Sequence, residues 1–411
     1  MKNKILMIAY HYPPVGSSSG VHRSLKFSQY LPSLGWQPTV LSVNPKAYDR
    51  TSDYQLKDIP NSVHVKRAFA LDTARHLAIK GRYPDIFALP DRWVSWLFGG
   101  IISGVVLIKR FRPNVIWSTY PIATAHLIGL ILHKLTGIPW VADFRDSMTE
   151  ETYPKEKSRW KAYRWIEEKA VKHASKLVFT TQGTLEMYRN RYPEADPEKF
   201  CVIENGYDED NFKEIEISTT EEQKSQLTLI HSGLLYPSER DPRDFFMAIS
   251  ELKRENQINR NSLKVVLRAS GHEDYYEDLI HKMDINDIIF LAKPIPYGDA
   301  LKEMIQTDGL LIFQASNCNH QIPAKIYEYL RAKRPIFALT DKAGDTANVL
   351  KRAGIYTIVP LDNKDAIKKG LIEFIKSLKE NNAPIASDEQ ISQHSREAKT
   401  REFSQLLDSI T

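Results

Sequence analysis

Lys325 and Glu328 are the two residues whose types and spacing best suit chemistry on a ligand. An apolar run at 309–313 predicts a buried strand, and Pro323 then stands at the expected first turn of a helix, where its missing N–H costs nothing. A spacing of three places both charged side chains on one face of that helix. Lysine and helix N-terminal N–H groups suit phosphate, and a carboxylate can accept hydrogen bonds from ribose hydroxyls. A surface ion pair between the two residues is the alternative.

Three further charges, Asp143, Arg145 and Asp146, stand at the carboxyl end of a very apolar predicted strand at 140–143. Ligands of α/β proteins bind at that end of the strands. Charges buried there without partners would be costly, so these three either pair among themselves or meet substrate hydroxyl groups. We interpret them as functional, with mutual pairing as the alternative.

The loop after the first predicted strand is rich in glycine and serine. Gly16 and Gly20 permit tight backbone turns, and the serines at 17–19 leave N–H groups that can point at a ligand. Arg23, in the first turn of the helix that follows, is placed to reach an anionic group. The loop lacks the G-x-G-x-x-G spacing of a dinucleotide site, and an ordinary connection is the alternative.

Two ring-bearing residues follow the predicted strand at 115–118. We expect Tyr120 to be presented at the mouth of a ligand cleft, since it comes just after the strand ends. His126 falls on a predicted helix among alanine, leucine and isoleucine. A histidine in such surroundings is more often a satisfied interior residue than a catalyst, and we predict an interior position.

The composition describes a globular protein with real cores. The chain has 411 residues, 42% of them hydrophobic and 26% charged, and its net charge is +5. So mild a charge does not require nucleic acid as a partner; a phosphorylated ligand or an anionic membrane surface fits equally well. Cys201 and Cys318 form neither a disulfide framework nor a metal-spaced set. We expect a cytoplasmic protein, with peripheral contact to the inner face of the cell membrane left open.

The longest apolar stretch covers 93–108 and is shorter than the roughly 20 residues that span a bilayer. It contains three glycines, begins with tryptophan and is followed by Lys109, Arg110 and Arg112. We predict a helix buried against a sheet, with an interfacial membrane helix as the alternative.

Short apolar runs without period-two alternation alternate with helical segments along the chain, which is typical of parallel strands covered on both faces. The predicted strands are 5–9, 38–43, 115–118, 140–143, 177–181, 227–232, 264–269, 288–291, 309–313, 335–339 and 355–358. We therefore predict an α/β protein with two Rossmann-like domains facing a cleft, at 1–206 and 207–386. The polar segment 387–411 is predicted to be a helix that packs back on the first domain.

A glycine-centred turn near 204–208 begins an acidic, polar linker that we extend to about residue 226. Within it, Asp208 and Asp210 have the D-x-D spacing of a metal site that binds nucleotide sugars. We interpret this pair as part of a solvated turn and predict no bound metal.

Taken together, these segments resemble the family 4-like glycosyltransferases of the two-Rossmann-domain GT-B fold, over nearly the whole chain. The resemblance is carried by the Tyr-Pro-Pro-x-Gly opening with Gly16, Gly20 and Arg23, Asp-Phe-Arg-Asp at 143–146, Asn-Gly-Tyr-Asp at 205–208, Ser-Gly-Leu-Leu-Tyr-Pro at 232–237 and Pro-x-Lys-x-x-Glu-Tyr at 323–329. Three positions depart from the family pattern. His320 replaces the first glutamate of E-x7-E, Leu234 replaces the arginine after Gly233, and Tyr120 stands where a histidine is common.

The resemblance implies that the second domain holds a nucleotide-sugar donor. Glu328 matches the second glutamate of E-x7-E and would bind the ribose. Lys325 and Arg240 resemble the basic pair at the diphosphate, with Gly233 beside them. The backbone of 294–297, including Pro294 and Ile295, resembles the loop that binds the base.

The resemblance also assigns the first domain to the acceptor. Gly16, Gly20 and Arg23 would approach the diphosphate from that side, while Asp143, Arg145 and Asp146 would lie on the acceptor side. His320 takes the place of a catalytic glutamate, and Tyr120 would contact the substrate.

The function implied is transfer of a sugar from a nucleoside diphosphate sugar to a glycan or lipid-linked acceptor, in cell-surface polysaccharide biosynthesis. Family 4 implies a retaining, metal-independent hexosyltransferase whose co-substrate is the nucleotide sugar, with no further cofactor and no nucleic acid. Two alternatives remain at this point: a nucleotide-sugar 2-epimerase or phosphorylase on the same scaffold, and a non-catalytic nucleotide-sugar or glycan-binding protein.

Overall fold

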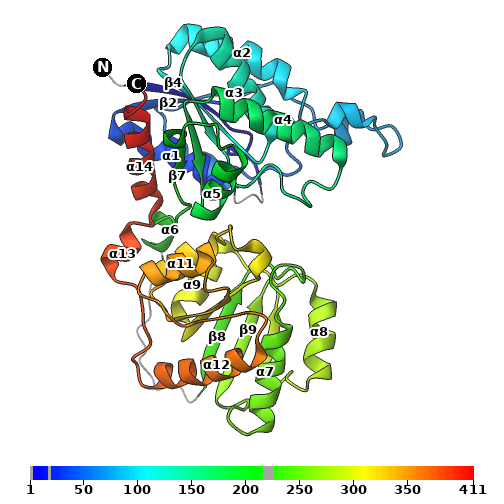
Figure 1. The fold of residues 1–411 in the computed structure, drawn as a ribbon, viewed down its shortest axis with the longest axis vertical. Coiled ribbons are helices and arrows are strands. Elements are labelled where there is room, and N and C mark those ends of the chain that lie inside the picture. Colours follow the sequence, from blue (N-terminus) through cyan, green and yellow to red (C-terminus); the bar gives the residue numbers. More distant parts are fainter. Residues whose placement is uncertain (1–2, 17–19, 214, 216–225) are drawn as a thin grey trace. The chain divides into compact units, whose positions relative to one another are not determined.

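The computed structural model describes residues 3–16, 20–213, 215 and 226–411, with the side chain of Tyr54 left out. The chain forms two compact units (Figure 1): unit 1 comprises Met1–Asn205 and Arg396–Thr411, and unit 2 comprises Gly206–Ser395. The serines at 17–19 and most of the predicted linker before residue 226 lie outside the described residues.

Unit 1 is built on a parallel sheet whose described strands follow the order β3-β2-β1-β4-β5-β6-β7. The strands are β1 (Asn3–Ile8), β2 (Trp36–Val43), β3 (His64–Ala68), β4 (Val115–Thr119), β5 (Trp140–Asp143), β6 (Lys176–Phe179) and β7 (Phe200–Val202). In register, Ile5 is paired with Pro38 of β2 on one side and Val115 of β4 on the other. The strand order reverses between β1 and β4, and ligands of open α/β sheets bind at such a switch point.

Helices cover both faces of this sheet because alternate residues of its strands point to opposite sides. The helices of unit 1 are α1 (Gly20–Tyr30), α2 (Trp96–Phe111), α3 (Ala123–Thr136), α4 (Lys157–His173), α5 (Gln182–Arg191) and α14 (Arg396–Asp408). Leu6 and Ile8 of β1 belong to the core that α2, α3, α4 and α5 complete. Ile5 and Met7 belong to the opposite core, which α1 and α14 complete.

Unit 2 repeats the design with a parallel sheet in the order β10-β9-β8-β11-β12-β13. Its strands are β8 (Leu227–Ser232), β9 (Leu263–Arg268), β10 (Ile289–Ala292), β11 (Gly309–Gln314), β12 (Ile336–Thr340) and β13 (Ile358–Val359). Its helices are α6 (Asp210–Lys213), α7 (Arg243–Arg254), α8 (Glu273–Lys282), α9 (Tyr297–Gln306), α10 (Lys325–Arg331), α11 (Asp345–Arg352), α12 (Lys364–Lys379) and α13 (Asp388–Ser392). The switch point lies between β8 and β11.

The predicted α/β class with parallel strands is confirmed in both units. The strands at 140–143 and 227–232 have the predicted bounds. Two edge strands, β3 and β7, were missed. β3 alternates between exposed and half-buried residues, and β7 has only three residues, so neither shows the apolar run of a covered strand.

The predicted return of the C-terminal helix to the first domain is confirmed. α14 packs on α1, where the ring of Phe403 stacks on that of Phe27 with their centres 4.5 Å apart. The Trp36 indole Nε1 also donates a hydrogen bond to Asp408 Oδ1 over 2.9 Å. The shorter helix α13, within the same predicted segment, belongs to unit 2.

The apolar stretch at 93–108 forms most of α2, and one side of this helix is buried as predicted. Trp96, Gly100, Gly104 and Leu107 make up the buried side. A Cβ at either glycine would collide with side chains of α3, so glycine lets the two helices approach closely. The opposite side of α2 is exposed. No helix in the described part of the chain has both the length and the apolar character needed to cross a membrane.

Candidate functional site

Lys325 is fixed at the switch point of unit 2 by a histidine. Its Nζ lies 3.0 Å from Nε2 of His231, a residue of β8 that is 1% exposed. The other ring nitrogen, Nδ1, lies 2.9 Å from the carbonyl oxygen of Leu311 in β11. Because a carbonyl oxygen only accepts, Nδ1 carries the proton and Nε2 accepts from the lysine. Pro323 lies just before α10 rather than in its first turn, since the helix begins at Lys325.

Gly233 and Arg240 complete the basic group around this lysine. Gly233 has φ +110°, and a Cβ there would lie 3.0 Å from Lys325 Nζ, so a side chain would fill the space in front of the ammonium group. Arg240 donates from Nη1 to the carbonyl oxygen of Leu234 over 3.2 Å, and its guanidinium lies over the ring of Tyr236. The structure therefore brings Gly233 and Arg240 close to Lys325; the diphosphate role that the resemblance implied for Lys325 and Arg240 remains a prediction.

The charge of Lys325 is suppressed by its surroundings. Burial, and then the positive charge of Arg240, lower the pKa of Lys325 from 10.5 to about 7, against the opposing effect of Glu328. Burial and the neighbouring lysine also hold the pKa of His231 well below its usual value. A ligand anion placed between Lys325 and Arg240 would relieve this repulsion and restore the lysine's charge.

Glu328 is reached by a residue of the predicted base-binding loop. Tyr297, the first residue of α9, donates its hydroxyl to Glu328 Oε1 over 2.6 Å. Pro294 is exposed and Ile295 half-buried, and both lie immediately before α9. The carboxylate and the loop thus share one side of the unit 2 site.

His320 lies in the loop between β11 and α10 and is half-buried. Its neighbour Asn319 donates to Asp341 Oδ2 over 2.6 Å and accepts at its carbonyl from the N–H of Asp345. These bonds tie the loop to the N-terminus of α11. The catalytic assignment of His320 remains a prediction.

In unit 1, Arg23 and Asp143 are partners of one another. Arg23 Nε and Nη2 lie 2.8 and 3.0 Å from the two carboxylate oxygens of Asp143, with side chains 3% and 0% exposed. Arg23 Nη1 also donates to the carbonyl oxygen of Glu204, and the Thr119 hydroxyl donates to Asp143. The roles predicted for Arg23 at an anion and Asp143 at an acceptor are therefore corrected. Each side chain has the other as its buried ion-pair partner. The pair connects the carboxyl ends of β4 and β5 to the first turn of α1.

Arg145 lies beside the first turn of α1. Its backbone is left-handed, at φ 46°, and its Nη1 donates to the carbonyl oxygen of Gly20 over 3.1 Å. A Cβ at Gly20 would lie 3.1 Å from that nitrogen and from the ring of His11, so a side chain there would crowd both neighbours. Burial and Arg145 lower the pKa of His11 to about 3, which keeps its imidazole neutral. Asp146, the next residue, is exposed.

Tyr120 does not lie at the mouth of a site. It is 2% exposed, with its ring against those of His126 and Tyr163. Its predicted contact with substrate is corrected on this ground, because packing against neighbouring rings holds the tyrosine ring in the core. His126 is an interior residue as predicted. Its Nδ1 lies 2.8 Å from Ser118 Oγ, and burial lowers the pKa of His126 to about 3.

Gly16 is held by the backbone of a later loop. Its N–H donates to the carbonyl oxygen of Arg50 over 2.9 Å, and a Cβ would lie 3.3 Å from that oxygen. The residues that follow it, 17–19, are outside the described part of the chain. Gly16 is therefore held against the loop that contains Arg50. Its predicted approach to a diphosphate remains a prediction.

The segment with D-x-D spacing is not a solvated turn. Asp208 is 5% exposed, and Glu209 accepts a two-bond ion pair from Arg331 of α10 at 2.6 and 2.7 Å. Among the residues that the structure describes, no group of three or more histidine, cysteine, aspartate or glutamate side chains could hold a metal ion.

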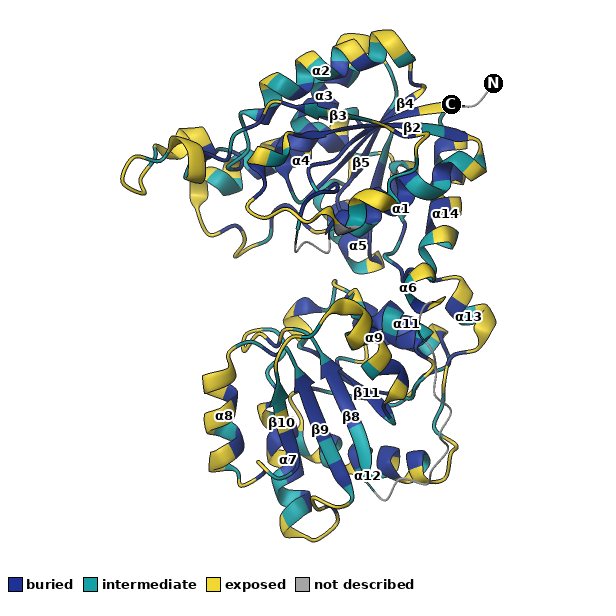
Figure 2. Cartoon of the chain, turned by 180° about the vertical axis from the view of Figure 1, so that it is seen from behind, coloured by how far each residue is buried: buried dark blue, intermediate teal, exposed yellow. Residues whose placement is uncertain are grey.

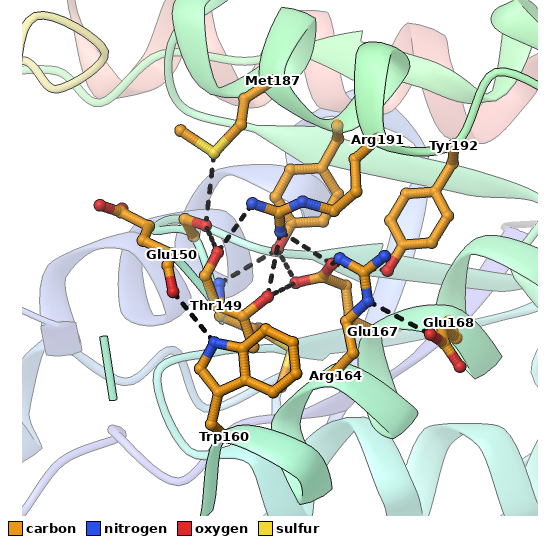
Figure 3. A network of polar contacts seen from close by, with 12 residues as sticks. Thr149, Glu150, Trp160, Arg164, Glu167, Glu168, Met187, Arg191 and Tyr192 are labelled. Atoms are coloured by element: carbon orange, nitrogen blue, oxygen red, sulfur yellow. Dashed lines mark hydrogen bonds and ion pairs between the residues drawn. The ribbon is translucent and has the colours of Figure 1, made fainter. Parts of the chain in front are cut away.

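A buried carboxylate anchors the loop that begins with Arg145 and Asp146 (Figure 3). Glu167 of α4 is fully buried and accepts hydrogen bonds from five other side chains. The donors and distances are Tyr192 Oη at 2.6 Å, Tyr188 Oη at 2.8 Å, Arg191 Nη1 at 2.8 Å, Thr149 Oγ1 at 3.0 Å and, from α4 itself, Arg164 Nη1 at 3.4 Å. Because Thr149 belongs to the loop and Tyr188, Arg191 and Tyr192 belong to α5 and its end, the network fixes the loop to the helices beneath it.

From the sequence we gave no role to His231, none to the Tyr297 hydroxyl beyond the place of this residue in the base-binding loop, and none to Glu167. The first had a usable signal, because it is the one polar ring in an apolar strand that ends next to Gly233. The last also had one, because a glutamate follows the buried Tyr163 and Ile166 on the inner side of α4. Tyr297 gave none, since its partner lies 31 residues away.

Residues 20–206 match the family model of the glycosyl transferase 4-like domain. A sequence search of curated proteins gives no match. Solved structures similar to the whole chain include Anabaena HepE in complex with UDP, at 14% identity, covering 99% of this chain and 100% of that chain, with a TM-score of 0.68. WaaG, a glycosyltransferase involved in lipopolysaccharide biosynthesis, is 13% identical, covers 98% and 99%, and has a TM-score of 0.63.

A proposed UDP-N-acetylglucosamine 2-epimerase from Listeria monocytogenes is also similar, at 12% identity, with 100% and 96% covered and a TM-score of 0.58. At these identities the likeness establishes the fold. The fold and the matched domain define the class that the chain resembles: it has the GT-B fold, and residues 20–206 match the glycosyl transferase 4-like domain.

Proposed function

We propose that this protein is a glycosyltransferase that takes its sugar from a nucleoside diphosphate sugar held in unit 2. The observation that carries the proposal is the group formed by Lys325, Arg240 and Gly233 at the end of β8, with Glu328 and Tyr297 beside it. In the proposed complex the diphosphate lies between the two cations, and the Glu328 carboxylate accepts hydrogen bonds from ribose hydroxyls. Uridine is the base to test first, because HepE, a protein of the same fold, binds UDP and UDP-glucose.

The reaction proposed is transfer to an acceptor hydroxyl with retention. The bond between the anomeric carbon and the β-phosphate oxygen breaks, and its electron pair leaves with the diphosphate. The acceptor oxygen forms the new bond on the same face, and its proton passes to the departing phosphate oxygen. Lys325 and Arg240 stabilise the charge that grows on the leaving group, so the transition state gains more than the ground state.

The acceptor we propose is a glycan or a glycolipid of the cell surface. Unit 1 offers Asp146 as an exposed carboxylate beside Arg145, at the carboxyl end of β5, where an acceptor hydroxyl can be received. The similarity of fold to WaaG supports a role in building surface polysaccharide. The nucleotide sugar is proposed as a co-substrate, with neither a metal ion nor another cofactor taking part.

Thermal stabilisation by nucleotides tests the donor. A ligand that binds only the native state raises its stability by mass action, so UDP should raise the melting temperature while GDP, ADP and CMP should not. Release of the nucleoside diphosphate, measured with UDP-glucose and a panel of glycan and glycolipid acceptors, then tests transfer. Stabilisation by none of the nucleotides would contradict the proposal.

Substitution of the two central side chains gives a sharper test. Lys325→Ala and Glu328→Ala should each weaken donor binding by about 2 kcal/mol, roughly thirtyfold, because each removes a charge-assisted hydrogen bond. Lys302→Ala, on the exposed side of the neighbouring helix α9, is the matched control and should bind as the wild type does. Titration calorimetry with UDP measures all three. Wild-type affinity in both site variants would place the donor elsewhere.

The 2-epimerase is the second candidate function, favoured by the similarity to the proposed Listeria enzyme. An epimerase converts the nucleotide sugar without any acceptor, whereas a transferase requires one. The third possibility, a non-catalytic binding protein, rests on His320 and Leu234, which differ from the family pattern. Donor binding without nucleotide release on any acceptor, and without epimer formation, would favour it.

A further inference from the structure

The loop that joins β10 to α9 has few means of holding its own position. It comprises residues 293–296 and contains most of the segment predicted to bind the base. Lys293, Pro294 and Pro296 are exposed, and Ile295 is half-buried. Because neither proline has a backbone N–H, only two peptide donors remain to anchor the loop. We call it the β10–α9 loop, and its position depends chiefly on groups outside it.

Arg268 supplies such a group from the neighbouring strand. It is the last residue of β9, which lies beside β10 in the sheet of unit 2 (Figure 2), and it is paired in register with Ala292. Its Nη1 donates to the carbonyl oxygen of Lys293 over 2.8 Å. The N–H of the next residue, Ala269, donates to the carbonyl oxygen of Ala292 over 2.7 Å. The start of the β10–α9 loop is thus fixed to the end of β9.

The same guanidinium group also holds the helix at the other end of the loop. Arg268 Nε and Nη2 donate to the two carboxylate oxygens of Glu303, a residue of α9, over 3.0 and 2.5 Å. The side chains are only 17% and 24% exposed, so solvent screens the pair incompletely. A planar contact with two parallel bonds fixes orientation as well as distance. One side chain therefore positions both the first residue of the loop and the helix that follows it.

The position of α9 also affects the carboxylate proposed for the ribose. Tyr297, the first residue of α9, donates its hydroxyl to Glu328 Oε1 over 2.6 Å. The group proposed for the diphosphate is held by different contacts, since Lys325 bonds His231 and Arg240 bonds the carbonyl oxygen of Leu234. The contacts that hold the nucleoside side of the site are therefore separate from those that hold the diphosphate side.

We propose that Arg268 is a positioning residue for the nucleoside half of the donor: by holding the β10–α9 loop and α9 in place, it sets the affinity for the base and ribose but not for the diphosphate. The inference rests on the donor site proposed for unit 2. Without the guanidinium group, the loop and α9 lose their common attachment to β9, while the bonds of Lys325 and Arg240 remain.

Titration calorimetry with UDP and with inorganic pyrophosphate separates the two halves of the site. The wild type should bind both, and UDP more tightly. Arg268→Ala should weaken UDP binding by about tenfold and pyrophosphate binding by less than about twofold, because a displaced loop loses hydrogen bonds to the nucleoside alone. Arg268→Lys should show the same selective loss, by about threefold or more, since an ammonium group lacks the planar fork that bonds the carbonyl and the carboxylate together. The lysine variant still decides the matter if the alanine variant does not fold.

The matched control is Arg331→Ala. Arg331 also forms a two-bond pair with a glutamate of unit 2, Glu209, and the two side chains are 25% and 38% exposed. It lies at the opposite end of α10 from Lys325, so this variant should lose a similar ion pair and keep the wild-type affinity for UDP.

A merely structural role for Arg268 would weaken the binding of UDP and pyrophosphate equally, and that result would overturn the inference. Wild-type UDP affinity in both Arg268 variants would overturn it too, as would a wild type that binds pyrophosphate as tightly as UDP. A wild type that binds neither probe would contradict the proposed donor site itself, and this inference with it.

Discussion

At the scale of single residues, the donor group in unit 2 depends on a neutral histidine that holds a lysine. The Leu311 carbonyl fixes the tautomer of His231, and the histidine in turn orients the Lys325 ammonium group. Neither effect can be read from the spacing of Lys325 and Glu328, because Leu311 and His231 belong to other strands. In this arrangement the pKa of Lys325 is lowered to about 7.

That pKa predicts how donor binding depends on pH. With the pKa of Lys325 at about 7, the free protein holds it mostly neutral above that pH, while a bound diphosphate favours the charged form. Binding should therefore take up a proton, and UDP affinity should fall by up to about tenfold for each pH unit above 7 and level off below it. Titration calorimetry in buffers of different ionisation enthalpy measures the proton directly. Lys325→Arg, which stays charged, should show no such dependence, and a flat profile in the wild type would contradict the assignment.

At the scale of elements, the loop after β5 is positioned by side chains from two helices. Glu167 receives donors from the loop and from α5, so one carboxylate joins three segments (Figure 3). Buried carboxylates are tolerated when every lone pair is satisfied by a donor. The loop that carries Arg145 and Asp146 is thus held from beneath by this network, in addition to the bond from Arg145 to the Gly20 carbonyl.

Glu167→Gln should destabilise unit 1 by about 3 kcal/mol, since it leaves the half-buried Arg191 without its anion and directs an amide N–H of a fully buried side chain at groups that donate. The control is Glu168→Gln, the same substitution at the next residue. That side chain is 51% exposed, so its free energy of unfolding should change by less than about 0.5 kcal/mol. Denaturant unfolding measures both. Equal effects from the two substitutions would show that the network contributes nothing specific.

At the scale of the whole molecule, the chain leaves unit 1 after Asn205, builds unit 2 and returns at Arg396 to complete the core of unit 1. Phe403 and Leu407 of α14 are fully buried beside Phe27 and Trp117. The C-terminal helix is therefore part of the first fold and not an appendage.

Phe403→Ala should cost unit 1 about 3–5 kcal/mol, because it removes a fully buried ring from a packed core. Amide hydrogen exchange should show lost protection in α1 and β1 while the strands of unit 2 keep theirs. Gln405→Ala, on the exposed side of the same helix, is the control and should leave exchange unchanged. Equal loss of protection in both units would show that they unfold as one.

The fold class and part of the candidate site could be predicted from the sequence alone. Covered parallel strands are continuous apolar runs, and the chain must pass from strand to helix at their carboxyl ends, so the α/β class and the location of Lys325, Glu328 and Gly233 follow from local pattern. Edge strands such as β3 escaped because one of their sides is left to solvent.

Only the tertiary structure decided which charges face a ligand and which face one another. Arg23 and Asp143 lie 120 residues apart and look equally suited to substrate, yet they neutralise each other in the core. Tyr120 ends a strand as a ligand-binding residue would, and packing turns it inward. Likewise, only the structure showed which side of α2 is buried and which is exposed. The reason is common to all three: a local sequence fixes the direction of the backbone, whereas the partners of a side chain come from distant segments that folding brings together.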